Sequence, residues 1–156
     1  MQIVKSVVNY LIDHNITISV CESLTGGLLA SKIVEIPNSS KIFSLGIVTY
    51  SNEMKEKFLE VNSDTIKKYD VVSKEVVSEM VIGLSKQIKS NIYISTSGYA
   101  GPTGLNIGKV CFGIMYEGRV YSYQVQFNNL NRNEIREETV NVIFKELSKI
   151  LGLQLL

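Results

Sequence analysis

The spacing of apolar residues changes several times along this chain, and each change marks a predicted element. Apolar residues three and four positions apart predict helices, whereas short apolar runs bounded by Gly, Pro, Asn or Ser predict strands. Helices are predicted over residues 1–13, 25–35, 74–89 and 131–151, with shorter ones opening at residues 51–53 and 63–64 and a short turn over residues 39–43. Strands are predicted over residues 16–21, 45–50, 91–97, 108–116 and 119–127.

The order of these elements indicates the fold class. Helices flank most of the strands, and the last two strands form a hairpin through Glu117-Gly118. This pattern predicts an α/β fold, a three-layer α/β/α sandwich with a mixed sheet of about five or six strands. No linker or repeat interrupts the chain, so a single domain over residues 1–156 is expected.

Composition narrows the classes of partner. The formal net charge of +1 gives no electrostatic case for binding nucleic acid. No apolar run is long enough for a membrane helix, and the first residues read as a helix rather than a signal peptide, so no membrane partner and a cytoplasmic location are expected. Cys21 and Cys111 lie in apolar strands and are predicted to be free, buried thiols. With His14 as the only histidine, at a helix end where capping is its ordinary role, no metal site is expected.

The segment Val20-Cys21-Glu22-Ser23-Leu24-Thr25-Gly26-Gly27 carries the strongest chemical signal. It passes from a buried strand through a small polar turn into a helix, an arrangement that can present a reactive hydroxyl beside a helix N-terminus. Ser and Thr at such positions are also ordinary N-caps, and the residues alone leave both interpretations open.

Two further strands end in polar turns, at residues 50–53 and 97–100. Ligands of open α/β sheets bind beyond the carboxyl ends of the strands, so these turns and the one at Ser23 are predicted to share a site. With no triad histidine available, Lys55 is the candidate base for Ser23, since it lies one helical turn beyond the second strand. A lysine serves as a base only if its pKa is lowered. An exposed helix lysine is the ordinary alternative.

Five segments together resemble the C-terminal domain of the CinA family. These are Cys-Glu-Ser-Leu-Thr-Gly-Gly-Leu-Leu-Ala, Ile-Pro-Asn-Ser-Ser, Gly-Ile-Val-Thr-Tyr-Ser-Asn-Glu-Met-Lys, Val-Ser-Lys-Glu-Val and Ser-Gly-Tyr-Ala-Gly-Pro. Stand-alone members of that family are nicotinamide-nucleotide amidases. The resemblance implies hydrolysis of nicotinamide mononucleotide to nicotinate mononucleotide and ammonia, with no cofactor and with a homo-oligomeric assembly. It implies Ser23 as nucleophile, Lys55 as its partner and Tyr50 as a residue of the same site.

The chemistry of amide hydrolysis suggests roles for neighbouring residues. Backbone N–H groups around Thr25, Gly26 and Gly27 are predicted to hold the oxyanion, and the Thr25 hydroxyl to orient Ser23 or bind substrate. Glu22 is predicted to orient Lys55 or substrate, with capping of the following turn as the alternative. The remaining predicted substrate contacts lie in the second and third turns: Asn52, Ser97 and Gly98.

Arg132 and Arg136 lie one turn apart on one face of the last helix and are predicted to bind the substrate phosphate, with surface salt bridges to neighbouring glutamates as the alternative. The chain departs from the family pattern at Ser97, which replaces a threonine, at Leu24, at Tyr99, which replaces an aliphatic residue, and in a shortened loop after Pro102. Two alternatives therefore stay open, an amidase for another carboxamide and a non-catalytic nucleotide-binding or regulatory module.

Overall fold

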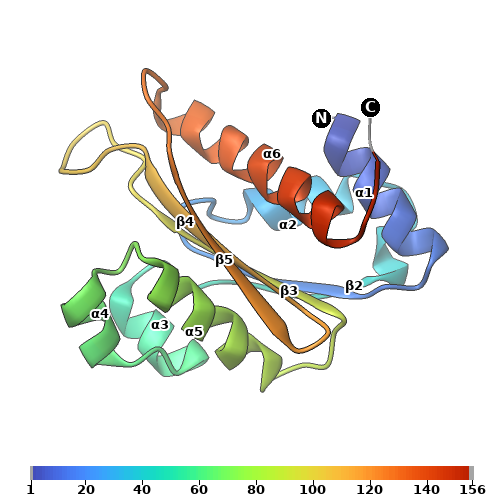
Figure 1. Ribbon diagram of the computed structural model, residues 1–156, viewed down its shortest axis with the longest axis horizontal. Coiled ribbons are helices and arrows are strands. Elements are labelled where there is room, and N and C mark those ends of the chain that lie inside the picture. The colour runs from blue at the N-terminus through green and yellow to red at the C-terminus, as the bar shows by residue number, and fades with distance from the viewer. Residues whose placement is uncertain (1, 155–156) are drawn as a thin grey trace.

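A five-stranded mixed sheet forms the centre of the structure, a computed structural model that describes residues 2–154 (Figure 1). Its strands are β1 (Ile18–Glu22), β2 (Phe43–Val48), β3 (Ile92–Gly98), β4 (Lys109–Tyr116) and β5 (Arg119–Gln126), in the order β2-β1-β3-β4-β5. Strand β1 runs parallel to β2 and β3, while β4 and β5 are antiparallel. The carboxyl ends of β1, β2 and β3 therefore meet at one edge of the sheet.

Helices cover both faces of this sheet and complete the predicted three layers. One layer holds α1 (Gln2–Asp13), α2 (Leu28–Val34) and α6 (Arg132–Ile150), and the other holds α3 (Asn52–Leu59), α4 (Ser63–Tyr69) and α5 (Lys74–Ser85). A single 3₁₀ turn, Ser39–Lys41, follows α2. None of the helices described over residues 2–154 combines the length and apolar character needed to cross a membrane.

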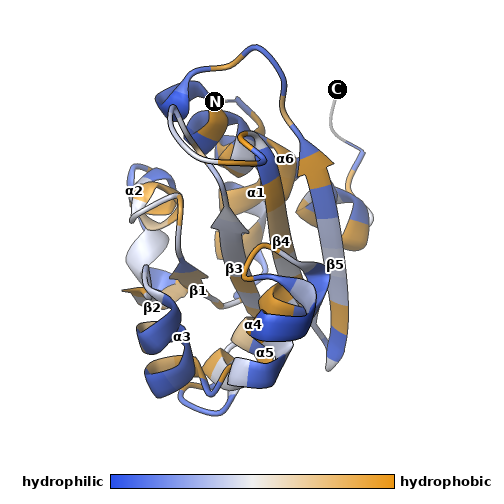
Figure 2. Ribbon diagram, turned by 90° about the vertical axis from the view of Figure 1, so that its left-hand side faces the viewer, coloured by the Kyte–Doolittle hydropathy of each residue, from blue (hydrophilic) through white to orange (hydrophobic). Residues whose placement is uncertain are grey.

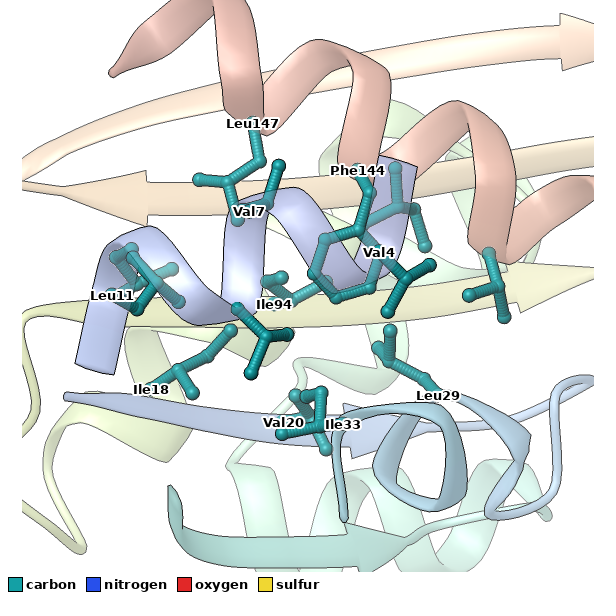
Figure 3. Packing of buried hydrophobic residues seen from close by; sticks show 14 of the residues in the cluster. Val4, Val7, Leu11, Ile18, Val20, Leu29, Ile33, Ile94, Phe144 and Leu147 are labelled. Atoms are coloured by element: carbon teal, nitrogen blue, oxygen red, sulfur yellow. The ribbon is translucent and has the colours of Figure 1, made fainter. Parts of the chain in front are cut away.

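Each layer buries its own apolar cluster against the sheet. The larger cluster joins α1, α2 and α6 to β1 and β3, with residues such as Leu11, Leu29 and Phe144 fully buried (Figure 3). The second cluster lies beneath α5 and contains both cysteines. Figure 2 shows hydrophilic residues over much of α3 and α4, which lie on the outside of that layer. Cys21 and Cys111 are free and buried, as predicted from their strands.

Several predicted boundaries are wrong, and the hydrogen bonds explain why. Helix α2 begins at Leu28 rather than Thr25, because Gly26 and Gly27 adopt left-handed φ angles of 55° and 99° that a right-handed helix does not allow. Strand β2 is Phe43–Val48 instead of 45–50, because its pairing with β1 starts at Phe43 and ends at Val48.

Some of the predicted helix caps and helix ends agree with the structure and others do not. Ser51 and Ser73 cap α3 and α5 as predicted, each accepting a hydrogen bond from a backbone N–H in the first turn. Helix α4 is instead capped by Asn62. Helix α5 ends at Ser85, short of the predicted residue 89, and the Tyr93 hydroxyl binds the backbone at Ile88 and Ser90 in the chain that follows.

Candidate active site

Ser23 follows the last residue of β1 at the carboxyl edge of the sheet, and it is only 7% exposed. Its backbone N–H donates to Thr96 Oγ1 at 3.0 Å, which fixes the turn to β3. Its Oγ lies 2.9 Å from Lys55 Nζ and 3.4 Å from the Tyr50 carbonyl oxygen. The structure therefore brings together the predicted nucleophile and the predicted base.

Lys55 projects from α3 into the protein, and its side chain is among the largest that are fully buried. Its Nζ is 2.9 Å from the Thr49 carbonyl oxygen and 3.0 Å from that of Tyr50, in addition to its contact with Ser23. The turn that follows β2 supplies both carbonyls, and Ser51 caps α3 directly after them. The interpretation of Lys55 as an exposed helix lysine is wrong.

Burial lowers the pKa of Lys55 from 10.5 to about 8, an effect that the nearby Cys21 thiol partly opposes. A neutral amine has two N–H donors and one lone pair. The two backbone carbonyls can only accept, so they use the two N–H donors of the neutral form. The lone pair is then left for the Ser23 hydroxyl, which is the arrangement that a general base requires.

Two threonine hydroxyls contact each other beside the Ser23 turn. Thr25 Oγ1 lies 2.9 Å from Thr96 Oγ1, which also accepts the Ser23 N–H. Thr25 is fully buried, so the prediction that it binds substrate is wrong, and it can orient Ser23 only through Thr96. Thr96 was not predicted; its only sequence signal is its place in a run of three hydroxyl residues, Ser95, Thr96 and Ser97, at the end of β3.

The Glu22 carboxylate caps helix α2. It accepts hydrogen bonds from the backbone N–H groups of Gly27, Leu29 and Ala30 at 3.2, 2.9 and 3.1 Å. With 1% exposure it has no access to substrate, and its side chain leaves the sheet on the side away from Lys55. The capping alternative is therefore the right one, and the prediction that Glu22 contacts Lys55 or substrate is wrong.

The predicted oxyanion donors also need correction. The Gly26 N–H donates to the Ser23 carbonyl at 3.1 Å, and the Gly27 N–H is held by Glu22. Neither is free for a substrate. Within residues 2–154, neither the Leu24 nor the Thr25 N–H has a hydrogen-bond acceptor, but Thr25 is fully buried and only Leu24 lines the cavity at Ser23, so the Leu24 N–H is the donor that remains available at the turn.

Tyr50 and Arg132 lie together at the mouth of the site. The Tyr50 side chain is 59% exposed, and its hydroxyl accepts a hydrogen bond from Arg132 Nη2 at 3.2 Å. Arg132 also donates to the Gly101 carbonyl. In the described part of the chain the Tyr50 hydroxyl makes no hydrogen bond to Ser23 or Lys55. The backbone carbonyl of Tyr50, in contrast, contacts both residues.

Arg136 does not share the position of Arg132. Its guanidinium donates to the carbonyl oxygens of Leu24 and Thr25, each at 3.0 Å, and to Asn133 Oδ1 at 3.0 Å. These contacts use three of its five N–H donors. The alternative of a surface salt bridge is wrong, because its partners are neutral oxygens, whereas phosphate binding by Arg136 stays a prediction.

A cavity of about 160 Å³ lies directly at the nucleophile. Its walls include half of the predicted site residues, namely Ser23, Tyr50, Asn52, Lys55, Ser97 and Gly98. Ser97 is 1% exposed, and its hydroxyl donates to the Val71 carbonyl at 2.9 Å, so it shapes the wall rather than offering a free donor.

Tyr99 lines this cavity and also a larger one of about 790 Å³, whose lining includes Arg132 and Lys109. Its hydroxyl donates to the Asp70 carboxylate, with O–O distances of 2.7 and 2.8 Å. Burial and this carboxylate raise the pKa of Tyr99 to about 12, so the phenol stays neutral. Asp70 was not predicted, and its position before Val71 gave no signal of this contact.

A family model described as the CinA C-terminal domain matches residues 1–151 of the chain. The chain is 43% identical over 138 residues to a competence-damage inducible protein of Clostridium botulinum, an alignment that covers 86% of this chain and 34% of the relative. It is 44% identical over 134 residues to a protein of the same description from Alkaliphilus oremlandii, with 83% and 32% covered. The chain thus spans about a third of the length of these relatives.

Solved structures of competence/damage-inducible proteins have the same fold as this chain. The competence damage-inducible protein A of Klebsiella pneumoniae superposes with a TM-score of 0.91 at 28% identity, covering 97% of this chain and 96% of that one. The competence/damage inducible protein of Agrobacterium tumefaciens gives a TM-score of 0.88 at 28% identity, covering 94% and 92%.

Proposed function

Because this chain belongs to the CinA C-terminal domain family, as its motifs indicated, we propose that it is an amidohydrolase that removes the carboxamide nitrogen of nicotinamide mononucleotide. The products are nicotinate mononucleotide and ammonia. Ser23 is the nucleophile and Lys55 is its general base. The names of the relatives describe induction by competence or damage and no reaction, so the activity rests on the site.

The observation that carries this proposal is the buried contact between Ser23 and Lys55. A serine hydroxyl is a weak nucleophile until a base takes its proton. Here the base lies 2.9 Å away, its pKa is lowered to about 8, and two carbonyls hold its N–H groups. A module that only bound a nucleotide would have no need to bury a lysine against a serine at such a desolvation cost.

In the first half of the reaction Ser23 Oγ attacks the carboxamide carbon while its proton moves to Lys55 Nζ. The carbonyl oxygen becomes an oxyanion, which the Leu24 N–H stabilises. Lys55 then gives the proton to the departing nitrogen as the C–N bond breaks. Ammonia leaves, and an ester links Ser23 to the nicotinate group.

In the second half a water molecule attacks the ester carbon and gives a proton to Lys55. The oxyanion forms again at the Leu24 N–H and collapses with cleavage of the bond to Ser23 Oγ. Lys55 returns the proton to that oxygen, which restores the hydroxyl and releases the carboxylate product. In each half Lys55 first accepts a proton from the attacking group, which is Ser23 and then water, and afterwards donates it to the leaving group.

Arg132 is the arginine that this proposal assigns to the nucleotide's phosphate. It lines the larger cavity beyond Tyr99, and its contact with the exposed Tyr50 hydroxyl keeps it at the mouth of the site. A guanidinium can bind phosphate oxygens with two parallel N–H donors. The pyridine ring then lies between the nucleophile and this cation.

The test is ammonia release from nicotinamide mononucleotide by the wild-type protein and by Ser23→Ala. Loss of the nucleophile is expected to lower kcat about 10³-fold or more. Ser40→Ala, a change at an exposed serine away from the site, should leave the rate unchanged. Release that survives in Ser23→Ala at the wild-type rate would refute the assignment of the nucleophile.

Hydrolysis of a different carboxamide is a second candidate, and the Tyr99–Asp70 pair favours it. Tyr99 lines both cavities and Asp70 lines the larger one, and Tyr99 stands at a position where the family pattern has an aliphatic residue. A panel of nicotinamide, its riboside, its mononucleotide and unrelated carboxamides distinguishes the candidates by kcat/KM. A protein that binds the mononucleotide but hydrolyses no member of the panel would be a non-catalytic module.

A further inference from the structure

The two cavities at the site contain charges of both signs in unequal number. Among the described residues that line them are three basic side chains, Lys55, Lys109 and Arg132, and one carboxylate, that of Asp70. Lys109 and Arg132 line the larger cavity, and neither forms an ion pair with a carboxylate within residues 2–154. Asp70 lines the same cavity, so a ligand that fills it meets both a positive and a negative region.

The Asp70 carboxylate is fixed by its contacts. It accepts the Tyr99 hydroxyl, with O–O distances of 2.8 and 2.7 Å, and its Oδ1 also accepts the Val71 N–H at 2.8 Å. The Asp70 backbone has a φ of 78° and a ψ of 155°, a conformation nearly confined to glycine. Residues held in such conformations cluster at ligand sites, and here the strained residue is the one that places a negative charge beside the cavity.

Tyr99 connects this carboxylate to the cavity at Ser23. The Tyr99 side chain lines both cavities, whereas Asp70 lines the larger one alone. An aromatic ring attracts a cation over its face, and a phenol that donates to a carboxylate is more electron-rich, which strengthens the attraction. The pKa of Tyr99 is raised to about 12, so the phenol keeps the proton that it donates. A cation beside Tyr99 is therefore favoured over a neutral group of the same shape.

The sizes of the cavities indicate which part of a substrate lies beside Tyr99. The cavity at Ser23, about 160 Å³, is smaller than the roughly 300–1,000 Å³ of pockets for drug-sized ligands, so it suits a single ring with its carboxamide. The rest of a nucleotide then lies in the larger cavity, where Arg132 and Lys109 suit its phosphate. In nicotinamide mononucleotide the ring nitrogen carries the ribose and a positive charge, which free nicotinamide lacks.

We propose that Tyr99 and Asp70 form a specificity-determining pair that selects carboxamides carried on a positively charged ring, such as an N-substituted pyridinium. This inference rests on the proposed amidase function and specifies the substrate class of the same site. It holds for the mononucleotide and for a different carboxamide alike, because it concerns the charge of the ring. Arg132 has the separate role of binding the phosphate.

The first experiment measures binding to Ser23→Ala by calorimetry, so that the ligand is not consumed. The ligands are nicotinamide mononucleotide and its dihydro form, which has a neutral ring and the same ribose and phosphate. Adding Asp70→Asn or Tyr99→Leu should weaken binding of the cationic form about 3- to 30-fold and change that of the neutral form less than about twofold. Asp64→Asn, the same substitution at an exposed position of α4, is the matched control and should change neither affinity.

Unchanged binding of the neutral form also shows that each variant retains a folded site. Equal weakening of both forms by Asp70→Asn would overturn the inference, because it would assign Asp70 to the ribose or to folding. Unchanged binding of both forms would overturn it as well. Tyr99→Phe keeps the ring but not the hydrogen bond to Asp70, so it should lose part of the preference for the cationic form. A full preference in Tyr99→Phe would overturn the pairing of the two residues.

The second experiment separates failure of this inference from failure of the proposed function. With Ser23 intact, ammonia release is measured from N1-methylnicotinamide, which has a cationic ring, and from neutral nicotinamide. The intrinsic reactivities of the two rings cancel when their kcat/KM ratio is compared between proteins. The ratio should fall about 3- to 30-fold from the wild type to Asp70→Asn.

An unchanged ratio would overturn the inference and leave the amidase function intact. A wild type that releases no ammonia from these compounds or from the mononucleotide would refute the amidase function, and the binding preference measured with Ser23→Ala then decides the inference. Binding of neither form by Ser23→Ala, together with no ammonia release by the wild type, would overturn both.

Discussion

Replacing Lys55 by methionine tests whether the buried lysine is neutral near physiological pH. Methionine keeps a long side chain in the space beneath α3 but cannot ionise. The change also removes three hydrogen bonds, to Ser23, Thr49 and Tyr50, and their loss destabilises the protein by an amount that does not depend on pH. The pH-dependent part of the stability difference therefore reports the lysine's protonation alone.

The magnitude follows from the lowered pKa. The folded protein has a Lys55 pKa of about 8 and the unfolded chain the ordinary value of 10.5, so between these values the unfolded state binds more protons. Wild-type stability contributed by this group consequently rises with pH across that window and is lowest below pH 8. At about 1.4 kcal/mol per pH unit, the free energy of unfolding of the wild type relative to Lys55→Met should rise by about 2–3 kcal/mol from pH 7 to pH 10.

Urea unfolding of both proteins at half-unit pH intervals measures this difference, and titration of the shared tyrosines and other lysines cancels between them. Lys57→Met, at an exposed position on the same helix, should show no such dependence. A difference that stays flat over this range would mean an ordinary pKa and would refute the neutral-base argument. The same pKa predicts that kcat/KM of the wild type rises about tenfold per pH unit and levels off above about pH 8.

Three further predictions concern the framework around the site. Glu22→Gln removes the negative charge at the N-terminus of α2 and turns the N–H group of the new amide toward the N–H groups of the helix. The free energy of unfolding, measured with urea, should fall by about 1–3 kcal/mol, and an unchanged midpoint would contradict the capping role. Gly83→Ala would place a Cβ 1.8 Å from the Leu59 carbonyl oxygen and should lower the free energy of unfolding by at least about 3 kcal/mol, whereas Ser85→Ala on the same helix should have a small effect. Burial raises the pKa of the Cys21 thiol and that of Cys111, so both should react with a disulfide reagent only at the rate of unfolding; fast labelling of the folded protein would show that either thiol is accessible.

Local patterns were sufficient to predict the layers, but they offered Lys55 only as a candidate partner of Ser23 beside an exposed lysine, and the family resemblance made the assignment. Parallel strands bring their carboxyl ends to one edge, and a lysine one turn into the following helix can reach back to it, so spacing along the chain carries this information. The boundaries of α2 and β2 could not be predicted from the sequence. They depend on the left-handed conformation of Gly26 and Gly27 and on strand register, which are properties of the folded backbone.

The roles of Glu22 and Arg136 show a different limit. Residue type predicted that each would bind a charged or polar group, and both do. Their partners, however, are backbone N–H and carbonyl groups, which every residue possesses and no sequence pattern marks. In sequence, a charged side chain that hydrogen-bonds to the backbone therefore cannot be distinguished from one that binds a ligand.

The separation of 111 residues between Thr25 and Arg136 has a consequence for biosynthesis. The nucleophile and its lysine leave the ribosome long before helix α6, and during that interval Leu24 and Thr25 lack their guanidinium partner. A nascent chain therefore contains Ser23 and Lys55 before the residue that contacts the Ser23 turn has been made. The conformation that this turn has in the folded protein can then form only after translation has passed Arg136.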